Sequence, residues 1–190
     1  MESDGKPVDV LMQEHRLIER VLDALELAAG HLERRHAVRP GFFLDAAAFI
    51  QGFADGCHHR KEEGVLFGAL SGSDLVEAGG PVDMLLDEHE QGRRLTRAMR
   101  DAATRLQAGD EGARDAVVSN ARRYAALLRD HIEKEDEMLF PMADHLLSAE
   151  QQAAVMRGFD RVELEEDGHG AQQRFPALAE SLEEEAKALR

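Results

Sequence analysis

The chain has 190 residues, a formal net charge of −15 and a single cysteine, Cys57. This length fits one domain with a sizeable core, and the negative charge argues against nucleic acid or an anionic membrane as a partner, because both would repel the chain. One cysteine excludes an intramolecular disulfide, the N-terminal residues lack the basic start and apolar run of a signal peptide, and no apolar stretch approaches the ~18 residues of a membrane span, so we expect a cytoplasmic protein.

The segments between proline and glycine residues are rich in Ala, Leu, Glu and Arg, which favour helices, and the expected fold class is therefore all-α. In chain order, the predicted helices cover residues 8–35, 42–70, 81–107, 113–146, 149–166 and 172–188. Pro81 stands in the first turn of the third helix, and Ser148 with Gln151 forms a capping box before the fifth. We expect an antiparallel up-down-up-down four-helix bundle over residues 8–146, with a C-terminal helical extension over residues 147–190 packed on it.

Each of the four bundle helices is predicted to carry a histidine on an inward stripe that is otherwise mostly apolar. The stripes, helix by helix, are Leu11, His15, Ile18, Leu22 and Leu25; Ala47, Ile50, Ala54, His58, Glu62, Val65 and Ala69; Val82, Leu85, His89, Gly92, Thr96, Met99, Ala103 and Leu106; and Val117, Ala121, Tyr124, Leu128, His131, Glu135, Met138 and Met142. A single histidine on such a stripe is usually a hydrogen-bonded core residue. Burying four histidines and two carboxylates without a shared partner is costly, whereas a metal centre would satisfy all of them.

The sequence contains an internal repeat of helix pairs. Residues 11–15, LMQEH, match residues 85–89, LLDEH, and residues 58–67, HHRKEEGVLF, match residues 131–140, HIEKEDEMLF. A two-fold repeat of this kind is a natural way to build a symmetric dinuclear site.

The repeat also resolves a choice of register in the second helix. Alignment on the Leu-Phe pair selects His58 and Glu62 as the inward residues. His59 and Glu63 then fall one step round the helix, where they either support the ligands or face solvent.

The depth of each histidine in the bundle separates site residues from others. The starts of the first and third helices lie beside the ends of the second and fourth, so the six stripe groups fall in one layer near one end. His31 is ~24 Å along its helix from His15, and His145 is ~21 Å from His131, at a rise of about 1.5 Å per residue. Neither should reach the site, and His36 is expected in a loop.

The spacing of the two His-x-x-x-Glu pairs suits a pair of metal ions. Residues four apart stack on one helix face, so each pair presents an imidazole and a carboxylate to the same point. Carboxylates can bridge two cations, imidazole suits iron, zinc or copper, and the lack of thiolates argues against a structural zinc site. The predicted metal ligands are His15, His58, Glu62, His89, His131 and Glu135.

The sequence resembles the hemerythrin-like family, also called the HHE cation-binding group, over roughly residues 8–146. The motifs that carry this resemblance are Glu14-His15, His58-x-x-x-Glu62 with Leu66-Phe67, Glu88-His89, and His131-x-x-x-Glu135 with Leu139-Phe140-Pro141. The resemblance implies a four-helix bundle around two iron ions, which are bridged by carboxylates and an oxygen species. Manganese or zinc remain alternative metals.

Two positions depart from the pattern of the oxygen-carrying members. Arg93 stands where they have a second histidine on the third helix, and Asp136 competes with Glu135 as the bridging carboxylate, although the repeat favours Glu135. One iron would then have a protein ligand fewer. The less certain ligand candidates are His59, Glu63, Asp136, Glu163, Glu166 and His169, of which the last three lie in a tail that is more often solvated.

Two further residues are expected in the core, each with a functional alternative. Cys57 is adjacent to His58 and would otherwise be a redox thiol. Tyr124 lies two turns before His131 and would otherwise donate a hydrogen bond to the centre.

Three functions follow from this interpretation. The first is a di-iron protein that senses oxygen, iron or redox state, with oxygen or a small oxidant as its ligand and an unknown protein partner. The second is a di-iron enzyme that handles peroxide or nitric oxide, and the third is a metal-free helical adaptor. Oxygen carriage is disfavoured by Arg93, and a repair role by the lack of the cysteine-bearing N-terminal extension of such relatives.

Overall fold

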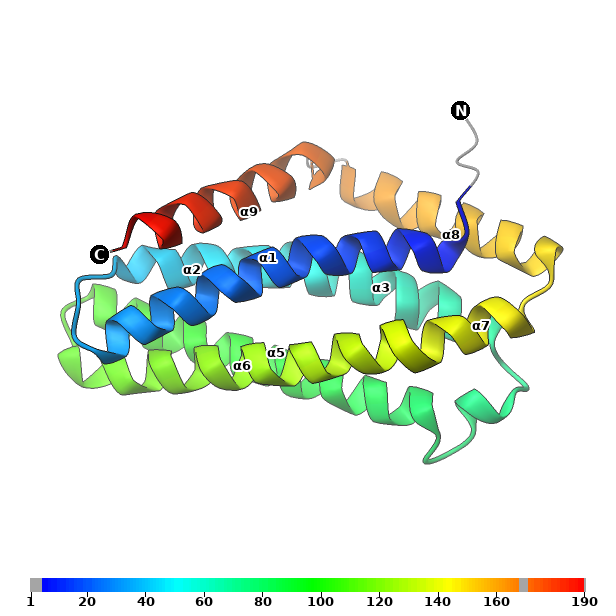
Figure 1. The fold of residues 1–190 in the computed structure, drawn as a ribbon, viewed down its shortest axis with the longest axis horizontal. Coiled ribbons are helices and arrows are strands. Elements are labelled where there is room, and N and C mark those ends of the chain that lie inside the picture. Colours follow the sequence, from blue (N-terminus) through cyan, green and yellow to red (C-terminus); the bar gives the residue numbers. More distant parts are fainter. Residues whose placement is uncertain (1–4, 168–170, 190) are drawn as a thin grey trace.

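The computed structural model describes residues 5–167 and 171–189, and within these ranges it contains no β-strand. The α-helices are α1 Pro7–Glu33, α2 Pro40–Phe49, α3 His59–Lys61, α4 Phe67–Ala69, α5 Pro81–Gln107, α6 Arg114–Lys134, α7 Phe140–Leu146, α8 Ala149–Asp167 and α9 Ala171–Ala188. Three π-helical segments, η1 Ile50–His58, η2 Glu62–Leu66 and η5 Glu135–Leu139, and two 3₁₀ turns, η3 Asp74–Val76 and η4 Glu111–Ala113, complete the order. The fold is all-α, as the composition predicts (Figure 1).

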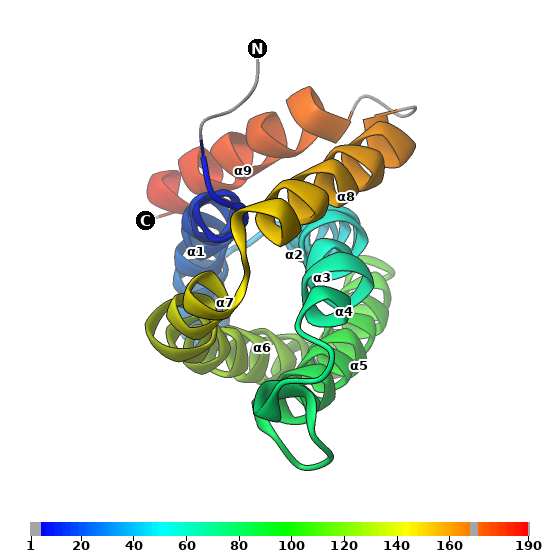
Figure 2. The same cartoon turned by 90° about the vertical axis from the view of Figure 1, so that its right-hand side faces the viewer.

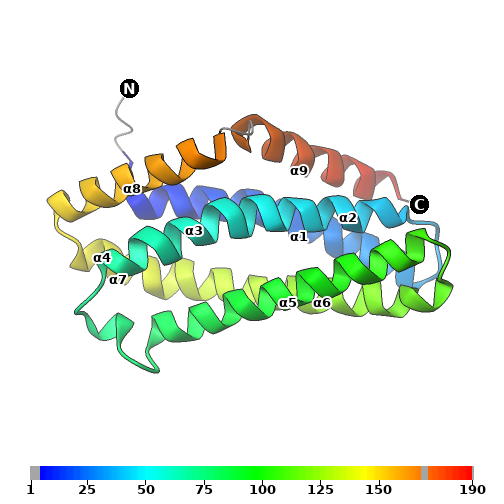
Figure 3. The ribbon, with the colours of Figure 1, turned by 180° about the vertical axis from the view of Figure 1, so that it is seen from behind.

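Four long helices form the bundle. The first is α1, the second runs from α2 to α4 through η1 and η2, the third is α5, and the fourth runs from α6 to α7 through η5. Consecutive helices run in opposite directions (Figure 3), and the end view shows the four of them arranged around a common axis (Figure 2). This is the predicted up-down-up-down bundle, although Pro40 is the first residue of the second helix rather than part of the preceding loop.

The predicted stripes of the first and third helices are buried along their whole length. Those of the second and fourth helices are buried only as far as Glu62 and Glu135. At each of these residues a π-helical segment begins, and a π turn holds more residues than an α turn. The inward face therefore moves on by one position beyond each glutamate.

The shift of register corrects four predicted stripe positions. Met138 and Met142 are 36% and 43% exposed, and Leu139, Phe140 and Ala143 are buried instead. In the second helix, Val65 and Ala69 are only partly buried, and the fully buried residues are Leu66, Phe67 and Leu70. The Leu-Phe pair of each repeat thus packs inward because of the π-helical segment before it.

The C-terminal helices α8 and α9 lie along α1 and the second helix, on one side of the bundle (Figures 1 and 2). The predicted capping box at the start of α8 is present, with Ser148 and Gln151 bonding each other's backbone N–H. Two glycines allow close approach, since a Cβ at Gly158 would lie 2.4 Å from Val65 and one at Gly52 would lie 2.2 Å from Phe175. The extension is therefore packed tightly against the second helix.

Two apolar clusters fill the bundle. The larger core surrounds the rings of Phe42, Phe43 and Phe49 and extends along most of the four helices to α9. The smaller core includes Phe67 and Phe140 and is closed by Val155 and Phe159 of α8 and their neighbours. Along each bundle helix, buried histidines or glutamates separate the residues of the larger core from those of the smaller core. Together these polar residues form one layer. Within the described ranges, no helix is both long and apolar enough to cross a membrane.

Candidate metal centre

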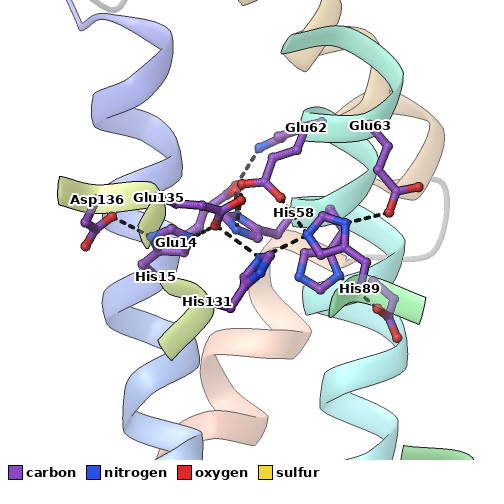
Figure 4. A network of polar contacts seen from close by, with 12 residues as sticks. Glu14, His15, His58, Glu62, Glu63, His89, His131, Glu135 and Asp136 are labelled. Carbon is purple, nitrogen blue, oxygen red and sulfur yellow. Dashed lines mark hydrogen bonds and ion pairs between the residues drawn. The ribbon is translucent and has the colours of Figure 1, made fainter. Parts of the chain in front are cut away.

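The polar layer is built by all four bundle helices (Figure 4). The first helix contributes His15, the third His89, the second His58, His59 and Glu62, and the fourth His131 and Glu135. All seven side chains are buried. The six residues predicted as ligands from the sequence are therefore in one place, and His59 lies with them.

These side chains form two groups that share one member. The first group is His15, His58, Glu62 and Glu135, and the second is His59, Glu62, His89 and His131. Within each group, one possible ligand atom from every residue lies within 4.8 Å of the others. Glu62 belongs to both groups, which is the arrangement that a bridge between two cations requires.

The two glutamates lie between histidines of different helices. Glu62 places Oε1 3.3 Å from His58 Nε2 and Oε2 3.5 Å from His89 Nε2. Glu135 places Oε2 3.2 Å from His15 Nε2 and 3.3 Å from His131 Nε2. Each carboxylate thus reaches a histidine of both groups.

Six inward atoms of this layer lack hydrogen bonds in the described structure. Both carboxylate oxygens of Glu62 and Glu135, and the Nε2 atoms of His15 and His58, are buried without a hydrogen-bond partner. Buried polar atoms are normally satisfied, and each orphan is costly. A cation bound by these atoms would satisfy all of them, so the donor set fits a metal.

The Nε2 atoms of His89 and His131 lie 3.0 Å apart and face each other. Two neutral imidazoles can satisfy this contact only if one donates a proton to the other. The same geometry allows both lone pairs to point at one cation.

Every histidine of the layer uses its other ring nitrogen for a carboxylate. The Nδ1 contacts are His15 with Asp136 at 2.7 Å, His58 with Glu14 at 2.9 Å, His59 with Asp55 at 2.9 Å, His89 with Glu63 at 2.7 Å, and His131 with Glu88 at 2.9 Å. Such contacts fix the ring orientation and the tautomer and raise the basicity of the inward nitrogen. The five rings are therefore set with Nε2 facing the centre.

Cations hold these carboxylates in turn. Arg16 pairs with Asp136, Lys61 with Glu14, Lys134 with Glu88, and Arg93 with Glu63. Asp136 and Glu63, which were weaker ligand candidates, therefore support His15 and His89 from outside the layer. Glu135 occupies the inward position that the repeat selects.

Arg93 and His59 together change the expected ligand count. Arg93 extends to Glu63 and lies 3.7 Å from Asp55, so it supports two carboxylates rather than entering the centre. The ring of His59 stacks on that of His89, with centroids 3.8 Å apart. An additional imidazole from the second helix thus stands beside His89, in one of the two groups of possible ligands. The expectation of one ligand fewer stays a prediction.

The two phenylalanines of the repeat cover the layer on the side of the smaller core. The ring of Phe140 stacks on His15 at a centroid distance of 5.4 Å, and that of Phe67 on His89 at 6.4 Å. Each ring comes from one half of the repeat and covers a histidine of the other half. The Leu-Phe motif therefore closes the polar layer with apolar surface.

Burial and neighbouring charges shift the pKa values of the histidines in this layer. Burial lowers the pKa of His58, but Glu62 and Glu14 raise it overall to about 10. In the same way burial lowers the pKa of His131 and Glu135 raises it to about 9. Burial and the positive charge of neighbouring histidines hold the pKa of His59 well below its usual range, so that its lone pair is available to a cation.

The remaining ligand candidates from the sequence are Glu163, Glu166 and His169. Glu163 bonds Lys61 at 2.5 Å, and the side chain of Glu166 and all of His169 are outside the described residues. His31 bonds His36 at 3.3 Å, and His36 lies in a loop as expected. His145 is exposed.

Cys57 and Tyr124 are both buried, as expected for core residues. The Tyr124 hydroxyl has no hydrogen-bond partner in the described structure, and its ring packs 3.5 Å from the position of a Cβ at Gly92. Burial, with a contribution from Asp55, raises the pKa of Tyr124 well above its usual value.

Glu14, Glu88, Asp55 and the two lysines, which support the histidines, were not assigned this role from the sequence. The signal was in the repeat, because Glu14 and Glu88 immediately precede a histidine, and Lys61 and Lys134 follow His58 and His131 by three residues. Asp55 has no counterpart of this kind.

The chain is similar in sequence to known proteins over most of its length. Residues 6–143 match the family model described as the hemerythrin HHE cation binding domain. The chain is 28% identical over 142 residues to the uncharacterized protein Rv1995 of Mycobacterium tuberculosis, a match that covers 73% of this chain and 54% of that protein. It is 27% identical over 138 residues to the iron-sulfur cluster repair protein YtfE of Cronobacter sakazakii, which covers 70% of this chain and 62% of that protein. The matches thus span little more than half the length of these relatives.

Proposed function

Because the chain belongs to the hemerythrin HHE cation-binding family, we propose that it holds a non-haem centre of two iron ions and uses it to sense or bind oxygen or a small oxidant. The observation that carries the proposal is the set of orphaned inward atoms on Glu62, Glu135, His15 and His58. Six such atoms lie in one buried layer, Glu62 belongs to both groups of possible ligands, and bound cations would satisfy all six atoms together.

The proposed ligands divide between two positions. His15 and His58 would hold the first ion, His59, His89 and His131 the second, and Glu62 and Glu135 would bridge them. The first position then has four protein donors and the second five. The mixed nitrogen and oxygen set without thiolate suits iron, and manganese or zinc are the other metals that such a set accepts.

The protein's own groups would orient and insulate the centre. Iron supplies reversible electron transfer and an affinity for small oxygen species. The Nδ1 carboxylates hold the imidazoles in one tautomer, so that the inward nitrogens are ready to bind without rearrangement. Phe67 and Phe140 exclude water from the side of the smaller core, and a dry site strengthens electrostatic interactions.

Metal analysis of the purified chain tests this proposal. We expect two iron ions per chain and, once air has oxidised the bound Fe²⁺ to Fe³⁺, a near-ultraviolet band from ligand-to-iron charge transfer. Both should be lost in a Glu62→Gln/Glu135→Gln double variant. A wild-type chain that retains less than one equivalent of metal after anaerobic loading with Fe²⁺ would overturn the proposal. It would then favour the metal-free helical adaptor.

An enzymatic role at the same centre is the second candidate. It is favoured by the four-donor first position, which leaves room for a substrate such as peroxide or nitric oxide. Peroxide turnover by the iron-loaded chain, lost in the double variant, would establish it, and a loaded chain that binds oxidant without turnover would leave sensing.

The similarity to a protein named for iron-sulfur cluster repair favours a third candidate. An iron donor would release its ions to an acceptor. Incubating the iron-loaded chain with an oxidatively damaged iron-sulfur enzyme should then restore that enzyme's activity, with the double variant as the control.

A further inference from the structure

Lys61 is a fully buried lysine beside the metal centre. Lysine is almost never fully buried unless it is paired. Its Nζ lies 2.5 Å from Glu14 Oε1 and 2.5 Å from Glu163 Oε1, and 5.6 Å from the centroid of the Phe159 ring. Glu163 and Phe159 belong to α8, so the C-terminal extension supplies half of the environment of this charge.

These contacts join α8 to a proposed metal ligand. Glu163 bonds Lys61, Lys61 bonds one oxygen of Glu14, and the other oxygen of Glu14 lies 2.9 Å from His58 Nδ1. No link in this chain of contacts exceeds 2.9 Å. The link from α8 to the ring of His58 is therefore continuous.

The internal repeat provides a reference for this arrangement. In the second half, Lys134 bonds Glu88, which bonds His131 Nδ1, so the same three residue types are in the same order. The side chain of Lys134 is 33% exposed, whereas that of Lys61 is 0% exposed. The additional feature of the first half is the cover by α8.

Because α8 packs closely against the second helix, its position is sensitive to small movements at that contact. Val155 and Phe159 are buried, and Gly158 approaches Val65 so closely that a Cβ would lie 2.4 Å from it. Val65 is three residues beyond Glu62. A close-packed contact of this kind leaves little room for α8 to shift without separating from the second helix.

We propose that α8 is coupled to the metal centre through Lys61, so that metal binding at His58 tightens the docking of α8, and docking of α8 raises metal affinity. Lys61 is a positioning residue in this proposal, which rests on the proposed metal-binding function. With Glu163 present, the ammonium is shared between two carboxylates, and Glu14 is left more available to polarise His58. By reciprocity, an effect of α8 on metal affinity implies an equal effect of metal on α8.

A matched pair of substitutions on α8 tests this coupling. Glu163→Gln removes the carboxylate that reaches Lys61. Glu165→Gln removes the exposed ion pair of Glu165 with Arg60 and should leave Lys61 and Glu14 in place. Both replacements preserve side-chain size, and circular dichroism will verify that both variants are folded.

The probe is Co²⁺, titrated against a chromophoric chelator, because it is stable in air and its visible spectrum reports the ligand set. We expect Glu163→Gln to weaken binding of the first ion about tenfold, at the lower end of the effect of removing a group that supports a ligand. Glu165→Gln should change it less than about twofold, as expected for an exposed pair.

The second readout is hydrogen exchange of peptides from residues 149–167, with and without Co²⁺. Exchange should slow on metal addition in the wild type and in Glu165→Gln, but not in Glu163→Gln. Equal metal affinities of the two variants would overturn the coupling but not the metal-binding proposal. The same holds if the wild type binds Co²⁺ and hydrogen exchange in α8 does not change. A wild-type chain that binds no Co²⁺ would overturn both the coupling and the metal-binding proposal.

Discussion

Replacing Glu62 by Gln should remove the stabilisation that metal gives to the protein. The two oxygens of Glu62 reach His58 and His89 in different groups, so this change removes one donor from each proposed ion. If a four-ligand site is worth about 10–16 kcal/mol, each donor contributes about 2.5–4 kcal/mol. The affinity for each ion should therefore fall about 70- to 900-fold.

Thermal unfolding with and without metal measures this loss. At free metal 100 times above Kd the wild type gains about 2.7 kcal/mol per ion, and a 100-fold weaker site gains only about 0.4 kcal/mol. For a chain of this length, the difference corresponds to about 5–9 °C in Tm per ion. The metal-dependent rise in Tm should therefore nearly disappear in Glu62→Gln.

Glu63→Gln is the adjacent control. Glu63 is partly exposed and contacts His89 Nδ1 and Arg93, so its loss should weaken one ion by about 10–100-fold. A higher metal concentration should then restore the full rise in Tm. The reasoning would be refuted if Glu62→Gln kept two equivalents of metal, or if Glu63→Gln lost as much as Glu62→Gln.

Three further predictions concern the protein around the centre. The pKa is about 10 for His58 and about 9 for His131, so protonation of these residues stabilises the metal-free fold. This stabilisation is complete below the ordinary histidine pKa of about 6.5 and is lost as pH rises through 9 to 10. Urea unfolding of the protein after a chelator has removed metal should therefore give a free energy of unfolding that falls from about pH 6.5 to 10, and a rise would contradict this. Gly52→Ala should lower Tm, because the added Cβ would lie 2.2 Å from the Phe175 ring. The resulting strain of about 1–3 kcal/mol exceeds the gain in helix propensity of about 1 kcal/mol. An unchanged Tm together with unchanged hydrogen exchange in α9 would refute the close contact. Tyr124→Phe removes a buried hydroxyl without a partner in the described structure, so unfolding of the metal-free protein should cost the same or about 1 kcal/mol more, and a loss of stability would show that the hydroxyl has a partner.

The helix count, the bundle and the location of the six stripe groups could be predicted because they depend on local patterns. The period of apolar residues fixes which face of a helix turns inward, and the rise per residue fixes depth. These rules hold for the first and third helices, which are regular α-helices throughout. They are also sufficient to separate His31 and His145 from the layer.

The π-helical segments could not be predicted in this way. An extra residue in a turn changes the periodicity only after that turn, and a stripe of small and apolar residues fits either register. Met138 and Met142 are therefore as compatible with the sequence as Leu139 and Phe140, although the smaller core accepts only one pair. The segments at Glu62 and Glu135 are found where the proposed ligands lie, as such bulges often are.

His59 shows the same limitation at the site itself. Periodicity assigns one inward position to a His-His pair, whereas η1 ends at His58 and brings both rings into the layer. Among the described residues, the additional imidazole beside His89 is thus that of a residue adjacent in sequence to another proposed ligand. Only the three-dimensional path of the second helix reveals this.

The division of the interior into two cores bears on how the protein matures. The larger core contains its own aromatic cluster and joins all four bundle helices, so the chain can collapse around it before any ion arrives. The smaller core, by contrast, lies beyond the polar layer and includes residues of α8. If the centre binds metal as we propose, the larger core would let the bundle form first, and the ions would then bind to a chain that is already folded.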